Sequence, residues 1–193
     1  MSELIRVSGV IPESIVDGPG IRYSLFVQGC PHHCPGCHNP QTHPFEGGTL
    51  RSVEEIVAEV KENPLISGVT FSGGEPMCQA KALTQLAREL KAIRKNIVCY
   101  TGYTFEQLLA ENDADRMALL AECRYLIDGP FLMAEKSLMV KFRGSKNQRI
   151  IDVKASLEAG QAVEANIKKS TASVSTGADF LLGKAWRRKE KCT

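Results

Sequence analysis

Three cysteines stand close together in the chain, at the spacing C-x3-C-x2-C: Cys30, Cys34 and Cys37. The proline and glycine residues between them favour tight turns, so the loop gathers three thiolates around one small volume. Thiolates in such a loop are ligands for zinc or for an iron–sulfur cluster. Structural zinc takes four protein ligands, whereas a cluster held by three cysteines keeps one iron open for chemistry. The spacing therefore favours a [4Fe–4S] cluster with an open iron.

Two other interpretations of this loop stay open. The four histidines of the chain all lie in or beside it, and one of them would complete a Cys3His zinc site: His32, His33, His38 and His43. A disulfide-bonded fold is less favoured, because seven cysteines are an odd number and a chain of 193 residues needs no such cross-links. The first residues lack the basic start and apolar stretch of a signal peptide, so we expect a reducing, cytoplasmic location.

The composition is that of a soluble globular protein. Apolar residues make up 43% of the chain and charged residues 24%, with a net charge of +2. No stretch approaches the ~18 consecutive apolar residues that a membrane-spanning helix needs. The main body shows no basic bias of the kind that indicates nucleic-acid binding.

Strand-like and helix-like segments alternate and would position the loop. Apolar and β-branched runs predict strands over residues 4–11, 21–28, 68–71, 97–100, 125–127 and 149–153. Helical periodicity follows in residues 53–60 and 83–93, and further helices are expected after Thr104 and over residues 113–122. This alternation indicates an α/β fold with a parallel sheet, right-handed crossovers and outer helices. Six strands are too few for a closed barrel of eight, so we expect an open, partial (β/α)6 barrel.

Four turns follow predicted strands, and the carboxyl ends of parallel strands meet at one edge of a sheet. They are the cysteine loop, Gly73-Gly74-Glu75, Thr101-Gly102 and Asp128-Gly129, which we expect to form a single site. Paired glycines let the backbone approach a ligand, and Glu75 can receive a cationic amine. A tight strand-to-helix turn would explain the glycines equally well.

Taken together, the cysteine loop and the sequence Gly73-Gly74-Glu75-Pro76 resemble the radical S-adenosylmethionine superfamily. Residues 16–22 (VDGPGIR) resemble the glycyl-radical activating enzymes of that superfamily. Residues 100–103, 126–131 and 142–148 are similar to blocks of the anaerobic ribonucleoside-triphosphate reductase activating proteins. The similar blocks extend from about residue 7 to residue 153.

This resemblance implies an oxidoreductase in which a reduced [4Fe–4S] cluster on Cys30, Cys34 and Cys37 gives one electron to bound S-adenosylmethionine. The products would be methionine and a 5′-deoxyadenosyl radical, which removes the α-hydrogen of a glycine in a partner reductase. The Gly73-Gly74-Glu75 turn would hold the methionine amino group, and a low-potential donor such as flavodoxin or ferredoxin would supply the electron. The alternatives are an activase of a pyruvate formate-lyase-type partner and, from another class, a zinc-stabilised binding module.

The chain departs from the family at one position. Many relatives have an aromatic residue that touches adenine just before the third cysteine, where this chain has Gly36. We expect the backbone from Gly36 through Cys37 to His38 to replace that contact, unless His38 only hydrogen-bonds the loop. Thr101 and Asp128, at strand ends, complete the predicted cofactor site; Asp128 would hold ribose or a monovalent cation, or merely cap a turn.

Three further residues are expected to recognise the protein substrate. Asp17 and Arg22 would orient the incoming glycine segment, or pair with each other. Arg143 would face the partner or brace the last strand.

The chain is expected to divide into a partial-barrel domain, residues 1–154, and an extension, residues 155–193. The extension would hold a short helix over residues 157–167 and a flexible tail, with seven lysines and arginines against four acidic residues. Outside the loop, Cys78, Cys99 and Cys123 are predicted to be buried apolar residues and Cys192 a free thiol.

Overall fold

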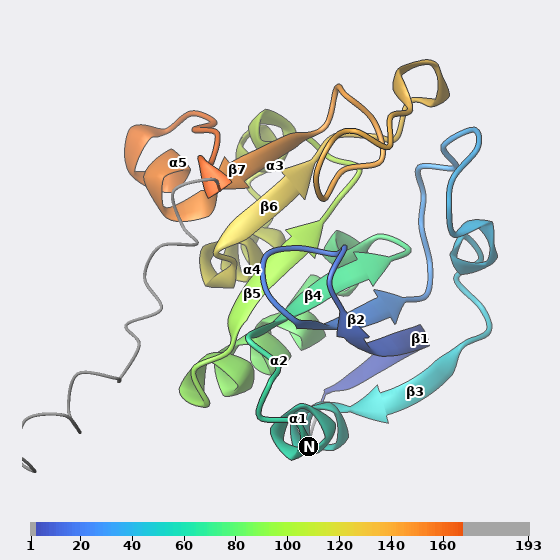
Figure 1. The fold of residues 1–193 in the computed structure, drawn as a ribbon, viewed down its shortest axis with the longest axis vertical. Helices are drawn as coiled ribbons and strands as arrows, with labels where there is room; N and C mark the ends of the chain where they lie inside the picture. The colour runs from blue at the N-terminus through green and yellow to red at the C-terminus, as the bar shows by residue number, and fades with distance from the viewer. Residues whose placement is uncertain (1–2, 168–193) are drawn as a thin grey trace, which may run out of the picture.

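The computed structural model describes residues 3–167, and Figure 1 shows them as one sheet with accompanying helices. The sheet has seven strands in the order β3-β1-β2-β4-β5-β6-β7. The strands are β1 (Leu4–Ser14), β2 (Arg22–Val27), β3 (Thr49–Ser52), β4 (Gly68–Gly73), β5 (Asn96–Tyr100), β6 (Tyr125–Asp128) and β7 (Arg149–Asp152). The helices are α1 (Val53–Glu62), α2 (Ala80–Ala92), α3 (Phe105–Glu111), α4 (Ala114–Glu122) and α5 (Val153–Ala159).

Only the centre of the sheet is parallel. Strands β2, β4, β5 and β6 run in one direction, whereas β1, β3 and β7 pair antiparallel with their neighbours. The predicted α/β fold is confirmed, but the prediction of a wholly parallel sheet is wrong at both edges. The connection from β1 to β2 is too short for a crossover helix, so the two strands form a hairpin. Strand β3 is absent from the prediction, because Leu50 is the single apolar residue among its four and none of them is buried.

The parallel centre is held by a core between the sheet and its helices. Leu83, Leu86 and Leu90 place one face of α2 in this core, and each is fully buried. The capping box at Ser52 and Glu55 begins α1, and a second box at Thr104 begins α3. The sequence predicted both helix starts, and both are confirmed.

The last described element begins earlier than predicted. Helix α5 begins at Val153, after Asp152 accepts a hydrogen bond from the Ala155 N–H at 3.1 Å, and it ends at Gly160 in the left-handed region, φ 66°. The prediction of a helix over residues 157–167 is therefore wrong at both ends, because Asp152 begins the helix earlier and Gly160 ends it. Predictions for the basic tail and for Cys192 lie outside the described residues.

The topology brings the turns that were expected to form the site together at the carboxyl ends of the parallel strands. The segments that follow β2, β4, β5 and β6 all start at the carboxyl ends of parallel strands. The opposite edge carries the strand starts, including Arg22 of β2. In the described part of the chain, no helix combines the length and the apolar character needed to cross a bilayer.

Candidate active site

A cavity of about 850 Å³ lies at the carboxyl ends of the parallel strands. Most of the residues that the sequence predicted for the site line it: Asp17, Cys30, Cys34, Cys37, His38, Gly73, Gly74, Glu75, Thr101 and Arg143. Gly36, Arg22 and Asp128 are not among the lining residues. The structure thus brings together the cysteine loop, the Gly-Gly-Glu turn and the turn after β5, as expected from a parallel arrangement.

The cysteine loop is fastened at several points and its thiols are free. The backbone N–H of Cys30 donates to the carbonyl of His43 at 3.0 Å, and that of Cys37 donates to the carbonyl of Cys34 at 3.1 Å. The N–H of Asn39 donates to Sγ of Cys37 at 3.4 Å. Burial raises the pKa of the Cys30 thiol, so a bound cation must supply the free energy that keeps it deprotonated.

The Gly-Gly turn owes its glycines to close packing on β2. A Cβ at Gly73, whose φ is +92°, would lie 2.6 Å from Cα of Phe26, and one at Gly74 would lie 2.3 Å from the carbonyl oxygen of Gly29. The backbone N–H of Glu75 donates to that same Gly29 carbonyl at 2.8 Å. Any side chain here would push the turn away from the start of the cysteine loop.

Glu75 does not offer a free carboxylate. Its side chain is 1% exposed, and its oxygens accept hydrogen bonds from the N–H of Met77 at 2.9 Å and of Gly102 at 2.8 Å. Nε2 of His32 lies 2.7 Å from Oε2 of Glu75. Three groups of the protein thus already bond this carboxylate, and the expectation that it also receives a cationic amine stays a prediction. Histidine within the cysteine loop was the signal that could have revealed this partner.

Arg22 lies away from the cavity, at the opposite edge of the sheet. It is fully buried, and its guanidinium donates to Thr70 Oγ1 at 2.6 Å, to the carbonyl of Val69 at 2.6 Å and to Asn96 Oδ1 at 2.9 Å. Burial lowers its pKa to about 10. A Cβ at Gly18 would lie 2.8 Å from Cδ of Arg22, so this glycine of the VDGPGIR motif makes room for the arginine. The expected contact between Arg22 and a protein substrate is corrected to an internal brace between strands.

Asp128 is also a structural residue. It is 1% exposed, and its carboxylate accepts hydrogen bonds from the Phe105 N–H at 2.8 Å and from Arg149 Nε at 3.0 Å. Arg149 in turn bonds both oxygens of Glu106. Asp128 thus caps α3 and anchors β7, and the expectation that it holds ribose or a cation is corrected. Its neighbour Gly129 does line the cavity.

Asp17 and Arg143 reach the cavity from different elements. Asp17 accepts hydrogen bonds from the hydroxyls of Ser14 and Ser24, and among the described residues no ion pair joins it to Arg22. Arg143 donates from Nη1 to the carbonyl of Gln148 at 2.9 Å, while its buried Nε has no partner among the described residues. This buried N–H lacks the partner that such groups almost always have, on a residue that lines the cavity.

One wall of the cavity comes from the long connection between β6 and β7. Phe131 packs against His38 with ring centroids 4.9 Å apart, and a Cβ at Gly144 would lie 3.0 Å from the Phe131 ring. A Cβ at Gly36 would lie 2.4 Å from the side chain of Met133, so this wall contacts the cysteine loop at Gly36, which stays exposed. Sequence reasoning missed Phe131, although it adjoins the Asp128-Gly129 turn.

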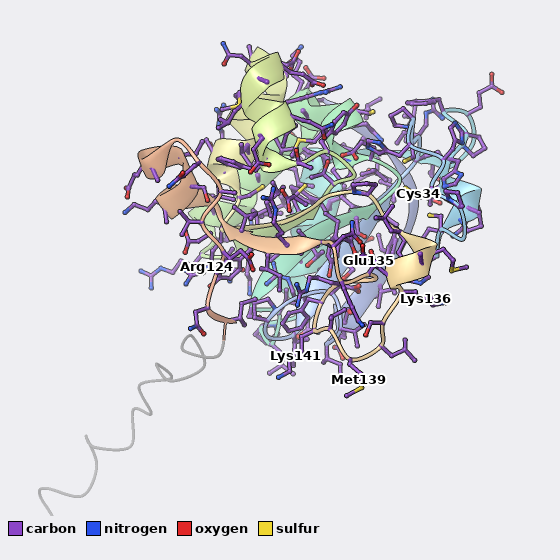
Figure 2. The ribbon with its side chains drawn as sticks, turned by 90° about the horizontal axis from the view of Figure 1, so that it is seen from above. Cys34, Arg124, Glu135, Lys136, Met139 and Lys141 are labelled. Carbon is purple, nitrogen blue, oxygen red and sulfur yellow. The ribbon has the colours of Figure 1, made fainter. Side chains whose placement is uncertain are left out.

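Tyr100 holds this wall in place, since its hydroxyl donates to the carbonyl of Phe142 at 2.7 Å. Figure 2 shows Lys136 of the wall on the same side of the molecule as Cys34, with Arg124 on the other side. The cavity lies between the cysteine loop and this wall, because residues of both line it.

The remaining cysteines separate into two kinds. Cys99 and Cys123 are buried and in contact with each other, as predicted. Cys78 is exposed, so its prediction as a buried residue is wrong. It lies in the single helical turn Pro76–Gln79 that follows the Gly-Gly-Glu turn and precedes α2.

The donor set of the cavity fits an iron–sulfur cluster. Three free thiols line one wall, and in a cubane each of them binds a different iron. Within residues 3–167, no group of three or more His, Cys, Asp or Glu side chains lies close enough together to hold a single metal ion. The unpartnered Nε of Arg143 and the glycine-lined turn leave polar backbone and side-chain groups for a second ligand beside the thiols.

Known proteins resemble the chain over most of its length. Residues 16–151 match the family described as 4Fe-4S single cluster domain. The anaerobic ribonucleoside-triphosphate reductase-activating protein of Vibrio cholerae is 38% identical over 147 residues, which cover 72% of this chain and 92% of that protein. The protein of the same name from enterobacteria phage T4 is 35% identical over 150 residues, covering 73% and 90%. Among solved structures, QueE from Escherichia coli is 18% identical, with a TM-score of 0.43 over 52% of this chain and 53% of that chain.

Proposed function

Because this chain belongs to the family of anaerobic ribonucleoside-triphosphate reductase-activating proteins, we propose that it installs a glycyl radical on such a reductase. The observation that carries the proposal is the convergence of Cys30, Cys34 and Cys37 with the Gly-Gly-Glu turn around one cavity. The enzyme is then a radical S-adenosylmethionine oxidoreductase. Its partner is the glycyl-radical subunit of the reductase, and its electron comes from a low-potential donor such as flavodoxin or ferredoxin.

We assign the cluster to Cys30, Cys34 and Cys37, whose three thiolates leave one iron without a protein ligand. When bound and reduced, the cluster supplies the electron that cleaves S-adenosylmethionine to methionine and a 5′-deoxyadenosyl radical. The buried position of Cys30 keeps water from that side of the site.

S-adenosylmethionine is assigned to the space beside the cysteine loop. Since the Glu75 carboxylate is committed to protein donors, the backbone oxygens of Gly73 and Gly74 are the groups that this turn offers to the methionine amine. Thr101 lines the space from the next strand. His38, supported by Phe131, is the aromatic side chain placed to contact adenine in the absence of an aromatic residue at position 36.

The open side of the cavity is assigned to the glycine segment of the partner. Asp17 and Arg143 border it, and the unpaired Nε–H of Arg143 is a donor for a backbone carbonyl of that segment. The exposed apolar residues Ile15, Val16 and Leu138 also line the cavity, which suits a partner segment that excludes water from the radical. We propose that residues 1–154 form this unit as an open, partial barrel and that the protein works in the cytoplasm.

One anaerobic assay tests the proposal. The chain is reconstituted with iron and sulfide, reduced, and mixed with S-adenosylmethionine and the reductase, and the glycyl radical is recorded by electron paramagnetic resonance. We expect a doublet signal on the reductase together with 5′-deoxyadenosine. A doublet on a pyruvate formate-lyase-type partner alone would assign the chain to another glycyl-radical enzyme. One zinc per chain with no sulfide would overturn the cluster itself.

A further inference from the structure

His32 lies at the point where three turns of the site meet. It stands between Cys30 and Cys34, and its Nε2 lies 2.7 Å from Oε2 of Glu75. An ionised carboxylate only accepts hydrogen bonds, so Nε2 is the donor in this pair. The same Oε2 accepts the N–H of Gly102 at 2.8 Å. One oxygen atom thereby joins the cysteine loop, the Gly-Gly-Glu turn and the turn after β5.

The packing around the imidazole is as specific as its hydrogen bond. A Cβ at Gly102 would lie 2.4 Å from Cδ2 and 2.6 Å from Nε2 of His32, so the glycine leaves the space that the ring occupies. The edge of the ring meets Tyr103, with centroids 4.6 Å apart, and the guanidinium of Arg116 covers Tyr103 at 4.6 Å. The His32 side chain is 18% exposed and that of Glu75 is 1% exposed. Burial of this kind makes the hydrogen bond strong and its loss costly.

We infer that His32 is a positioning residue: acting through Glu75, it fixes the spacing between the cysteine loop and the Gly73–Gly74 turn. The inference rests on the proposed function, because it assigns the cluster to the loop and the methionine amine to the turn. S-adenosylmethionine must reach both at once, so a change in their spacing weakens its binding even when each part is intact. His32 itself touches neither the reacting bond nor, by this assignment, the cosubstrate.

Two substitutions separate the hydrogen bond from the packing. In His32→Gln the side-chain amide presents an N–H donor at about the place of Nε2. In His32→Phe the ring still fills the space beside Gly102 and Tyr103, but the donor is lost. The matched control is His33→Asn, next to His32 in the same loop. The His33 ring meets that of His43, 5.2 Å away, and its φ of 47° suits asparagine.

The experiment measures binding on the reconstituted full chain under anaerobic conditions. Iron and sulfide content, the dissociation constant of S-adenosylmethionine by equilibrium dialysis, and the change in the resonance spectrum of the reduced cluster on its addition are recorded for each variant. We expect His32→Phe to keep its iron but to bind S-adenosylmethionine about tenfold more weakly, with a smaller change in the cluster spectrum on its addition. His32→Gln should stay within about threefold of wild type, and His33→Asn should equal it.

Several results would overturn the inference. Wild-type affinity in His32→Phe, or affinity in His32→Gln as weak as in His32→Phe, would show that the hydrogen bond positions nothing. Loss of iron in His32→Phe would place the residue in cluster assembly instead. If the wild-type chain itself fails to bind S-adenosylmethionine, the proposed function falls; if it binds and the variants do not differ, only the role of His32 falls.

Discussion

Two buried charged residues lie at opposite ends of the parallel strands of the sheet, and each bonds several neighbouring segments. Arg22, at the strand starts, donates to the β4 backbone and to Asn96, and it does not line the cavity of the site. Glu75, at the strand ends, accepts from three donors and lines the cavity. Both side chains are almost completely buried, and both bind backbone groups of neighbouring segments.

The comparison shows that burial of a charge does not by itself mark a functional site. The guanidinium of Arg22 donates to regular strands, whose positions the backbone hydrogen bonds of the sheet already fix. Glu75 joins its own turn to two other irregular segments beyond the strand ladders, where few backbone bonds, such as that from the Glu75 N–H to the Gly29 carbonyl, link them. A parallel sheet fixes its strands more firmly than its carboxyl-end loops, so a buried carboxylate there contributes to the geometry of a site.

The largest expected effect lies in the cysteine loop. Cys34→Ser should abolish formation of 5′-deoxyadenosine, because a hydroxyl does not replace the thiolate of a three-cysteine cluster. Product is measured by chromatography after reduction with S-adenosylmethionine present. Cys78→Ser, which changes an exposed cysteine outside the loop, is the control and should retain product. Cleavage that persists in Cys34→Ser would remove the cluster from this edge of the sheet.

Arg22→Met tests the opposite end of the strands, and we expect it to lower the free energy of unfolding without changing cosubstrate binding. The substitution leaves Thr70 Oγ1, the Val69 carbonyl and Asn96 without their buried donor, which we expect to cost about 3 kcal/mol. Urea denaturation measures this loss. In the folded fraction, the affinity for S-adenosylmethionine should stay within about twofold of wild type.

The matched control is Arg88→Met, which removes an exposed ion pair with Glu122 and should cost less than about 1 kcal/mol. If Arg22→Met instead weakened cosubstrate binding without loss of stability, the contrast between the two edges would be wrong.

Tyr100→Phe sharpens the comparison at the wall of the cavity. Losing the bond to the Phe142 carbonyl should cost about 1 kcal/mol and loosen the wall. Limited trypsin digestion, mapped by mass spectrometry, should then cut severalfold faster at Lys141. Tyr23→Phe removes a hydroxyl bonded to Glu59, far from the wall, and should leave this rate unchanged.

The smallest effect concerns Glu106, which Arg149 holds at the edge of the sheet. Hydrogen bonds from Arg149 lower the pKa of Glu106 to about 2. A carboxylate with a folded pKa below its unfolded value stabilises the fold above about pH 4.5 and loses this contribution as pH falls toward 2. Glu106→Gln should therefore lower stability at pH 7 by less than about 1 kcal/mol, since the side chain is half exposed.

Thermal unfolding from pH 7 to pH 3 follows this difference, which should shrink with acidification. A difference between wild type and Glu106→Gln that grows at low pH would contradict the assignment of this ion pair.

Much of the site at the carboxyl ends of the strands was predictable from sequence, because the signals for it are local. The cysteine spacing, the paired glycines and the strand that precedes each turn are contained in short segments, and parallel strands bring their ends together. The capping boxes of α1 and α3 are equally local. The structure adds the contacts between these segments, which the sequence analysis did not pair: His32 with Glu75, and Phe131 with His38.

The errors fall where a residue's role depends on a partner far along the chain. Arg22 resembles a recognition residue until Asn96, 74 positions later, is seen to accept from it. Asp128 resembles a ligand until Arg149 and the start of α3 surround it. The direction of β7 likewise depends on where a connection without a regular helix returns to β6. Spacing and periodicity do not contain such long-range pairings.

The contact between Met133 and Gly36 also has a consequence for the time during which the protein is made. These residues are about a hundred positions apart, and a ribosome adds about 5 to 20 residues per second. For several seconds of synthesis the nascent chain carries all three thiols without the segment that later contacts Gly36. During that interval iron, sulfide and oxygen meet the thiols before the β6–β7 connection lines one side of the cavity.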